Sequence, residues 1–217
     1  MIGHQHQWYG CVSYAQHGDD MAVLNVFHRL GVERGTYVDV GAHHPFELSN
    51  TALLYARGWR GVNVEANPNL IQSFIEHRPY DRTVQAAVVG EGSDVGQVVL
   101  YLASEISGVN STVRSNMADH GIVDEVSVPT TTLSRVVREH CDGVWPDLVS
   151  IDAEGRDLEI LSGILPRPMV LLVEAVSQGG DASGELRRVA ESRGYDVHSW
   201  CGHNALLVRR DLMERLR

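Results

Sequence analysis

Residues 36–50, with the sequence TYVDVGAHHPFELSN, constrain the fold more than any other stretch of the chain. Residues 37–40 form a short, mostly apolar and β-branched run that ends at Gly41, and a helical segment is expected from about Leu48. A strand that passes through a sharp turn into a helix is typical of doubly wound α/β sheets. Ligands bind at this edge of such sheets, so the sequence predicts a ligand site beside Gly41.

Two acids at expected strand ends indicate the kind of ligand. Asp39 and Gly41 are spaced as D-x-G, in which the glycine lets the backbone approach a ligand and the aspartate adds a negative charge. Residues 61–65 form the next expected strand, and Glu65 closes it. An acid at the end of the second strand can accept hydrogen bonds from both hydroxyls of a ribose. We therefore expect a cofactor that carries a ribose.

Two ribose-bearing cofactors compete for this position. A dinucleotide requires a G-x-G-x-x-G turn for its pyrophosphate, whereas Gly41 is followed here by residues 42–45, AHHP. Proline and two histidines would crowd that turn. S-adenosylmethionine has no phosphate and carries a cationic sulfonium and an amino group, so an aspartate beside it is favourable. The turn therefore favours S-adenosylmethionine.

Four segments occur in order along the chain: VDVGAH, NVEANP, VPTTTL and SIDAEGRDLEIL. Together with SYAQHGDD at residues 13–20, this order resembles the FkbM family of S-adenosylmethionine-dependent methyltransferases, over about residues 13–208. The resemblance implies an α/β, Rossmann-like class I methyltransferase fold, with a mostly parallel central sheet and helices on both faces. It also implies methyl transfer, most often to a hydroxyl, and places residues 16–20 over the cofactor.

Further positions are expected to contact the cofactor. Ser49 and Asn50 precede a helix, where each can cap the helix, contact the methionine carboxylate, or do both. Residues 83–88 are expected to form the third strand, whose end touches the adenine in Rossmann-like methyltransferases, although small residues there equally suit strand packing. The expected cofactor contacts are Gln16, Asp39, Gly41, Ser49, Asn50, Glu65, Ala66, Ala86 and Ala87.

Four core strands are expected to end in acids, namely Asp39, Glu65, Asp152 and Glu174. Their carboxylates should converge on one crevice, because the carboxyl ends of parallel strands share one edge. With the first two assigned to the cofactor, Asp152 and Glu174 would face the acceptor and could hold Mg²⁺ or Mn²⁺. Such an ion could lower the pKa of the acceptor hydroxyl and orient it. Alternatively, Asp152 or Glu154 acts alone as a general base.

Histidines add candidates for the same site. His203 precedes the last expected strand, which borders the acceptor side in this fold, so it is expected to be a metal ligand or a base. The expected metal ligands are therefore Asp152, Glu174 and His203, and the expected catalytic residues are Asp152, Glu154 and His203. His43 and His44 follow the cofactor turn and could instead be structural or solvated.

Composition restricts the possible partners. The chain has 217 residues, with 28 acids against 18 bases and a net charge of −10, which argues against nucleic acid and anionic membranes. We expect an N-terminal segment of residues 1–17 and one methyltransferase domain of residues 18–217. Three scattered cysteines, the lack of a signal pattern and the lack of a membrane span predict a reduced, cytoplasmic protein. A homodimer is the general expectation for such a protein.

The family resemblance points to natural-product or glycan acceptors, so we expect a small hydroxylated acceptor. A sugar hydroxyl is the first choice, and a mannoside or methylated mannoside is the sugar to name. Polar residues 104–116 would form either a flap over this acceptor or an ordinary surface loop. The alternative functions are a nucleotide-dependent oxidoreductase and a non-catalytic protein that binds S-adenosylmethionine. The last alternative is disfavoured because cofactor binding alone does not require Asp152 and Glu174.

Overall fold

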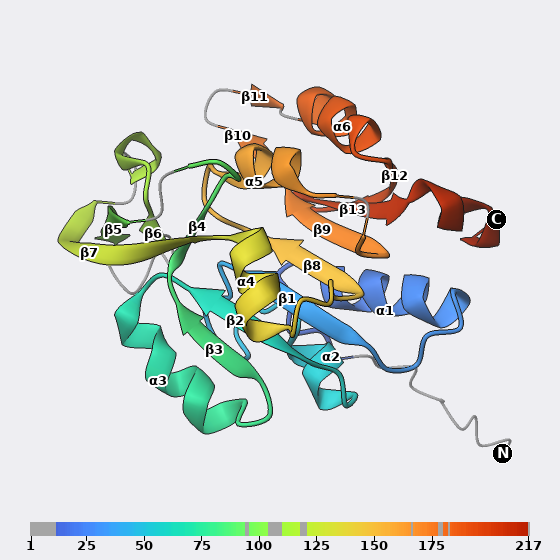
Figure 1. The fold of residues 1–217 in the computed structure, drawn as a ribbon, viewed down its shortest axis with the longest axis horizontal. Coiled ribbons are helices and arrows are strands. Elements are labelled where there is room, and N and C mark those ends of the chain that lie inside the picture. Colours follow the sequence, from blue (N-terminus) through green and yellow to red (C-terminus); the bar gives the residue numbers. More distant parts are fainter. Residues whose placement is uncertain are drawn as a thin grey trace, which may run out of the picture.

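The computed structural model describes residues 12–93, 96–103, 110–117, 121–165, 167–177, 180–181 and 183–216. In these residues a central sheet has the strand order β12-β13-β9-β8-β1-β2-β3 (Figure 1). Five of its strands are parallel: β1 (Thr36–Val40), β2 (Arg60–Glu65), β3 (Arg82–Gln85), β8 (Leu148–Ile151) and β9 (Val170–Glu174). The antiparallel strands β12 (Tyr195–Cys201) and β13 (Asn204–Arg209) complete one edge. The predicted mostly parallel sheet is confirmed.

Helices cover both faces of this sheet, as predicted, because alternate strand residues point to opposite sides. Leu171 and Val173 of β9 belong to one apolar core, and Val170 and Leu172 belong to the other. On the first face lie α4 (Leu133–His140), α5 (Asp157–Gly163) and α6 (Ser183–Ser192). On the second lie α1 (Asp19–Arg29), α2 (Ala52–Ala56) and the 3₁₀ helix η2 (Arg210–Leu216), while α3 (Pro68–His77) connects β2 to β3.

The expected third strand, residues 83–88, is wrong as a single element, because it divides at Ala86. The Ala86 N–H still donates to the Glu65 carbonyl at 3.1 Å, but β4 (Ala87–Val89) then leaves the central sheet. It pairs with β7 (Ile122–Thr132), which in turn pairs with β5 (Gln97–Ala103). This second sheet buries its own apolar cluster, in which Ala87 packs with Leu100, Leu102 and Val128.

Part of the expected polar flap is regular structure. Residues 104–109 lie outside the described part of the chain, but β6 (Asn110–Ser111) pairs with β5, and η1 (Arg114–Met117) follows as a 3₁₀ helix. A short antiparallel pair, β10 (Val176–Ser177) and β11 (Gly180–Asp181), follows β9. Among the described helices, none is long and apolar enough to cross a membrane.

The helix expected from about Leu48 begins later, at Ala52. Leu48 has a φ of 55°, in the left-handed region, which an α-helix of L-residues does not contain. The Ser49 hydroxyl accepts hydrogen bonds from the backbone N–H groups of Thr51 and Ala52, at 3.3 and 3.2 Å. The segment between β1 and α2 is therefore an irregular loop held by side chains.

Candidate active site

A pocket of about 390 Å³ opens at the carboxyl edge of the parallel strands. It lies where the strand order reverses, since β2 and β3 follow β1 on one side and β8 and β9 lie on the other. Expected site residues that line it are Gln16, Asp39, Gly41, Asn50, Glu65, Ala66, Ala86, Ala87, Asp152, Glu154, Glu174 and His203. Ser49 is not among the described residues that line the pocket, and its hydroxyl is buried in the loop.

The Gly41 turn joins the two halves of the sheet. Gly41 has a φ of 71°, and its N–H donates to the Val64 carbonyl at 2.9 Å. A Cβ atom at this position would lie 1.7 Å from the backbone oxygen of Asp152. Only glycine allows the ends of β1 and β8 to approach this closely, which places Asp39 and Asp152 in the same pocket.

Glu65 is oriented by its own surroundings at the end of β2. Its two carboxylate oxygens accept hydrogen bonds from the backbone N–H groups of Asn67, at 2.7 Å, and His43, at 2.8 Å. The side chain is 6% exposed, and burial raises the pKa of Glu65 to about 7 despite these hydrogen bonds. Each oxygen keeps a lone pair that can accept from a ribose hydroxyl.

Asp39 lies on the neighbouring strand and is also buried. One carboxylate oxygen accepts from the Thr51 hydroxyl at 2.6 Å. Burial raises the pKa of Asp39, while hydrogen bonds from Thr51 and Ser150 and the charge of Arg78 oppose that rise. Asn50 donates its side-chain amide to the Ser150 hydroxyl at 3.2 Å, so Asn50 is tied to the same group of residues.

Three carboxylates form a tight cluster, and two of them, Asp152 and Glu174, line the pocket. Asp152, Asp157 and Glu174 each provide one carboxylate oxygen, and these oxygens lie within 4.8 Å of one another. Within the described residues, Oδ1 of Asp152 is buried without a hydrogen-bond partner. Burial, followed by the charge of Glu174, raises the pKa of Asp152, and burial and the charge of Asp157 raise that of Glu174. Acids this close together are stabilised by a neighbouring cation or by protonation.

Asp157 is the member of this cluster that the sequence reasoning missed. Its carboxylate accepts from the backbone N–H groups of Ala153, at 2.7 Å, and Gly155, at 3.0 Å, and burial raises its pKa. An acid in the first turn of a helix usually interacts with the helix dipole, so the presence of Asp157 there does not by itself indicate a metal ligand. Its position just after the turn that follows Asp152 was the available signal.

His203 is not part of the carboxylate cluster, although it was expected to be a metal ligand. It lies in the turn between β12 and β13, where its carbonyl accepts from the Ala175 N–H at 2.8 Å. Its ring meets that of His17 edge-on, with 5.4 Å between the centroids. Asp157 completes the carboxylate group with Asp152 and Glu174, and His203 lines the same pocket as these last two acids, so its role as a ligand stays a prediction.

Glu154 lies in a strained turn over the pocket, with a φ of 49°. Its carbonyl accepts from the Ser111 hydroxyl at 2.8 Å and from the Asn116 amide at 2.6 Å, so β6 and η1 hold the turn in place. Burial, with a smaller contribution from Asp157, raises the pKa of Glu154 to about 7. Its carboxyl group can therefore exchange a proton near neutral pH.

The N-terminal segment reaches the pocket through Gln16. Asp19 accepts from the side-chain amide of Asn204 at 3.1 Å, and Asp20 accepts from the Ser13 hydroxyl at 2.6 Å and the Tyr14 N–H at 2.8 Å. Both acids are fully buried, so they anchor this segment in addition to starting α1.

The other two histidines have separate positions. His43 lines the pocket, and burial together with the neighbouring His44 lowers its pKa. The ring nitrogen Nδ1 of His44 accepts from the backbone N–H groups of Phe46 and Glu47, at 3.2 and 2.9 Å. His44 therefore stabilises the loop, whereas His43 faces the pocket.

A doubly wound sheet with a glycine turn after β1, an acid ending β2 and a pocket at the reversal of strand order is the arrangement of Rossmann-like folds that bind ribose-bearing cofactors. The methyltransferase FkbM domain matches residues 39–197, which is most of the chain. The chain therefore belongs to the FkbM methyltransferase family, and it is an S-adenosylmethionine-dependent methyltransferase. Comparison with curated proteins gave no match.

The structurally similar solved proteins are distant in sequence. A TehB-like S-adenosylmethionine-dependent methyltransferase from Corynebacterium glutamicum is 12% identical, with 89% of this chain and 88% of that chain covered and a TM-score of 0.43. A precorrin-6y C5,15-methyltransferase from Geobacter metallireducens is 14% identical, with coverages of 87% and 86% and a TM-score of 0.44. A 1,6-didemethyltoxoflavin-N1-methyltransferase from Burkholderia thailandensis is 13% identical, with coverages of 89% and 77% and a TM-score of 0.43. These similarities are too distant to indicate an acceptor.

Proposed function

We propose that this methyltransferase transfers a methyl group to a hydroxyl of a sugar or glycoside, with a divalent cation held by Asp152, Asp157 and Glu174. The observation that carries the proposal is the cluster of three carboxylates, in which one buried oxygen of Asp152 has no hydrogen-bond partner within the described part of the chain. A binding site for the methyl donor alone does not require it.

The cofactor end of the pocket suits S-adenosylmethionine. Glu65 would accept from the ribose hydroxyls, and Asp39 would balance the positive charges of the donor. Ala66, Ala86 and Ala87 line the pocket with small side chains, which would leave room for a flat adenine. Gln16 would cover the cofactor from the N-terminal segment.

The carboxylate cluster fits a hard divalent cation. Its donors are all oxygen atoms, which Mg²⁺ and Mn²⁺ prefer over the nitrogen and sulfur ligands favoured by zinc. When bound, such an ion would acidify an acceptor hydroxyl and counter the charge of the three acids. Asp157 accepts from two backbone N–H groups, and Glu174 is the last residue of β9. The backbone therefore holds these two acids in place before any ion binds.

Polar groups that could meet an acceptor also line the pocket. Asn110 and Thr112 line it, together with Arg156, whose Nε donates to the Thr112 hydroxyl at 2.8 Å. Amides, hydroxyls and one guanidinium suit the many hydroxyls of a sugar. The surrounding carboxylates disfavour a phosphorylated acceptor by charge repulsion. Glu154 also lines the pocket and is the candidate base if the hydroxyl proton passes directly to a protein side chain.

Methyl transfer to a panel of glycosides, mannosides included, tests this proposal. The purified protein is incubated with S-adenosylmethionine and either Mg²⁺ or a chelator, and the products are identified by mass spectrometry and NMR. We expect an O-methylated glycoside that requires Mg²⁺ and disappears in Asp157→Asn, but not in Glu139→Gln, a surface control on α4. Methylation of nitrogen or carbon only would contradict the hydroxyl acceptor, and undiminished transfer in chelator would contradict the metal.

A homodimer in the cytoplasm remains our expectation for the assembly and compartment. Sedimentation velocity on the purified chain measures its mass directly, and a monomer across the tested concentrations would contradict the dimer.

A further inference from the structure

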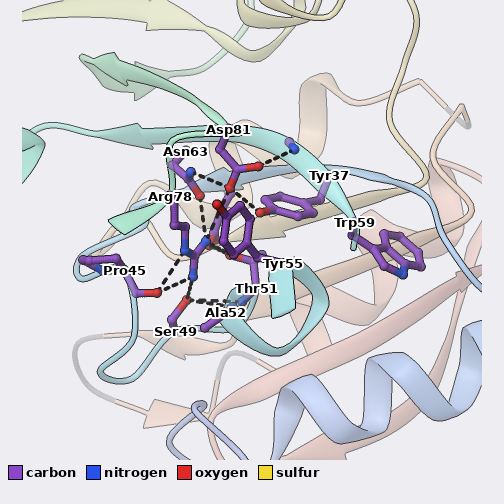
Figure 2. A network of polar contacts seen from close by, with 12 residues as sticks. Tyr37, Pro45, Ser49, Thr51, Ala52, Tyr55, Trp59, Asn63, Arg78 and Asp81 are labelled. Carbon is purple, nitrogen blue, oxygen red and sulfur yellow. Dashed lines mark hydrogen bonds and ion pairs between the residues drawn. The ribbon is translucent and has the colours of Figure 1, made fainter. Parts of the chain in front are cut away.

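Arg78 is a fully buried cation at the end of α3, outside the group of expected site residues. Its guanidinium has five N–H donors, and the structure gives each of them an acceptor (Figure 2). The acceptors are the Pro45 carbonyl, contacted by Nε at 2.9 Å and Nη2 at 2.6 Å, and the side chains of Ser49, Thr51 and Asn63, at 2.7, 2.8 and 3.0 Å.

The surroundings of Arg78 compensate for the burial of its charge. Asp81 lies 3.9 Å from Nη1 and is itself held by the Gly61 N–H, the Asn63 amide and the Tyr37 hydroxyl (Figure 2). The rings of Phe74 and Tyr55 lie 5.5 and 5.6 Å from the guanidinium carbon, within the range of cation–π contacts. A buried, fully bonded guanidinium of this kind keeps one geometry.

Three of the acceptors belong to residues 45–51, the irregular loop between the Gly41 turn and α2. The same loop carries Leu48 and Asn50 into the pocket. Because the loop has no regular hydrogen-bond ladder, the guanidinium of Arg78 supplies hydrogen bonds that a helix or strand would otherwise provide. The position of Asn50 in the pocket therefore depends on Arg78.

Thr51 connects Arg78 to Asp39. Its hydroxyl accepts from Nη1 of Arg78 and donates to Oδ2 of Asp39, at 2.8 and 2.6 Å. A hydroxyl has one hydrogen, and Arg78 can only donate, so the hydrogen of Thr51 must point to Asp39. This fixes one oxygen of Asp39 as an acceptor and orients the carboxylate in the pocket.

We propose that Arg78 is a positioning residue of the cofactor site, acting through Thr51 on Asp39 and through the loop on Asn50. Neither Arg78 nor Thr51 is among the described residues that line the pocket, so both act through other residues. The inference rests on S-adenosylmethionine binding between Asp39 and Asn50, and it adds to that site a buried group that sets its geometry.

Calorimetric titration of S-adenosylmethionine into Thr51→Val tests the inference. Valine has nearly the shape of threonine but lacks the hydroxyl, so Asp39 and Nη1 of Arg78 each lose a partner. The matched control is Tyr37→Phe, which removes a hydroxyl from the far side of the same network, where Asp81 is its partner. Unfolding of both variants is measured in urea, so that a general loss of stability is separated from a loss at the site.

We expect Thr51→Val to weaken cofactor binding by about tenfold or more, since a buried group left without a partner commonly costs that much. Tyr37→Phe should lose stability and bind as wild type. Thr51→Ser, which keeps the hydroxyl, should restore binding, and the Mg²⁺ affinity of Thr51→Val should equal that of wild type. If Thr51→Val does not fold, Arg78→Lys, which keeps the charge but not the five bonds, is expected to show the same loss.

Three results would overturn the inference. First, Thr51→Val, or Arg78→Lys in its place, could bind S-adenosylmethionine with an affinity within twofold of wild type. That result would show that the hydrogen bonds through Thr51 do not position Asp39. Equal weakening in Tyr37→Phe would show a general effect of instability. Absence of binding in wild type would contradict the methyltransferase assignment itself, which separates that failure from a failure of Arg78 alone.

Discussion

Replacing Gly41 with alanine should damage the site more than the fold. An alanine at a φ of 71° costs about 1–2 kcal/mol, because its Cβ meets the backbone in the left-handed region. In this position the new Cβ would also lie 1.7 Å from the Asp152 oxygen, whereas real Cβ contacts essentially never fall under 3.0 Å. One of the two strand ends must therefore move by more than an ångström.

The cost of that movement follows from packed interiors. Forcing an extra methyl group into a filled site costs about 1–3 kcal/mol, so the total loss for Gly41→Ala should be about 2–5 kcal/mol. Each kcal/mol lowers the melting temperature of a domain of this size by about 2–4 °C. Because Asp39 and Asp152 sit beside the moved backbone, binding of both S-adenosylmethionine and Mg²⁺ should fall with it.

Gly31→Ala is the matched control for this prediction. Gly31 has a φ of 77°, but a Cβ there would meet nothing within 4 Å, so only the conformational cost of about 1–2 kcal/mol applies. Urea unfolding and calorimetric titration of both variants measure the two effects. Equal stability losses in the two variants, with normal cofactor binding in Gly41→Ala, would refute the reasoning.

Three further predictions concern single side chains in or beside the pocket. Asp157→Asn should weaken Mg²⁺ binding by at least about tenfold, because even residues that only contact a metal ligand contribute that much to metal affinity. A calorimetric Mg²⁺ affinity equal to that of wild type would contradict the role of Asp157 as a ligand. Wild-type affinity for S-adenosylmethionine should rise between about pH 6 and 8, because burial raises the pKa of Glu65 to about 7 and its charged form accepts ribose hydroxyls; Glu65→Gln should flatten that profile. His203→Ala should retain Mg²⁺ affinity, since its ring lies outside the carboxylate cluster, and a large loss would restore it as a ligand.

Strand ends were predictable because they depend on local pattern and simple topology. The apolar runs before Asp39, Glu65, Asp152 and Glu174 identify strands, and parallel strands bring their carboxyl ends to one edge, so their shared pocket followed from the sequence. Their chemical roles remain predictions.

Other features depended on the folded chain. Arg78 looks like an ordinary cation after a helix, and only the return of the loop at residues 45–51 surrounds it with acceptors. The departure of β4 at Ala86 depends on an apolar cluster with β5 and β7, which no local pattern contains. Leu48 adopts a left-handed conformation that its residue type disfavours, so the start of α2 was placed too early.

Titration of S-adenosylmethionine into wild type and Asp152→Asn, each without and with excess Mg²⁺, is the decisive experiment for a metal-assisted methyltransferase. We expect micromolar-range binding of the methyl donor to wild type and a separate Mg²⁺ signal that disappears in the variant. Binding of the donor without any response to Mg²⁺ would shift the chemistry to a general base such as Glu154. Failure of wild type to bind S-adenosylmethionine under either condition would contradict the proposed cofactor site.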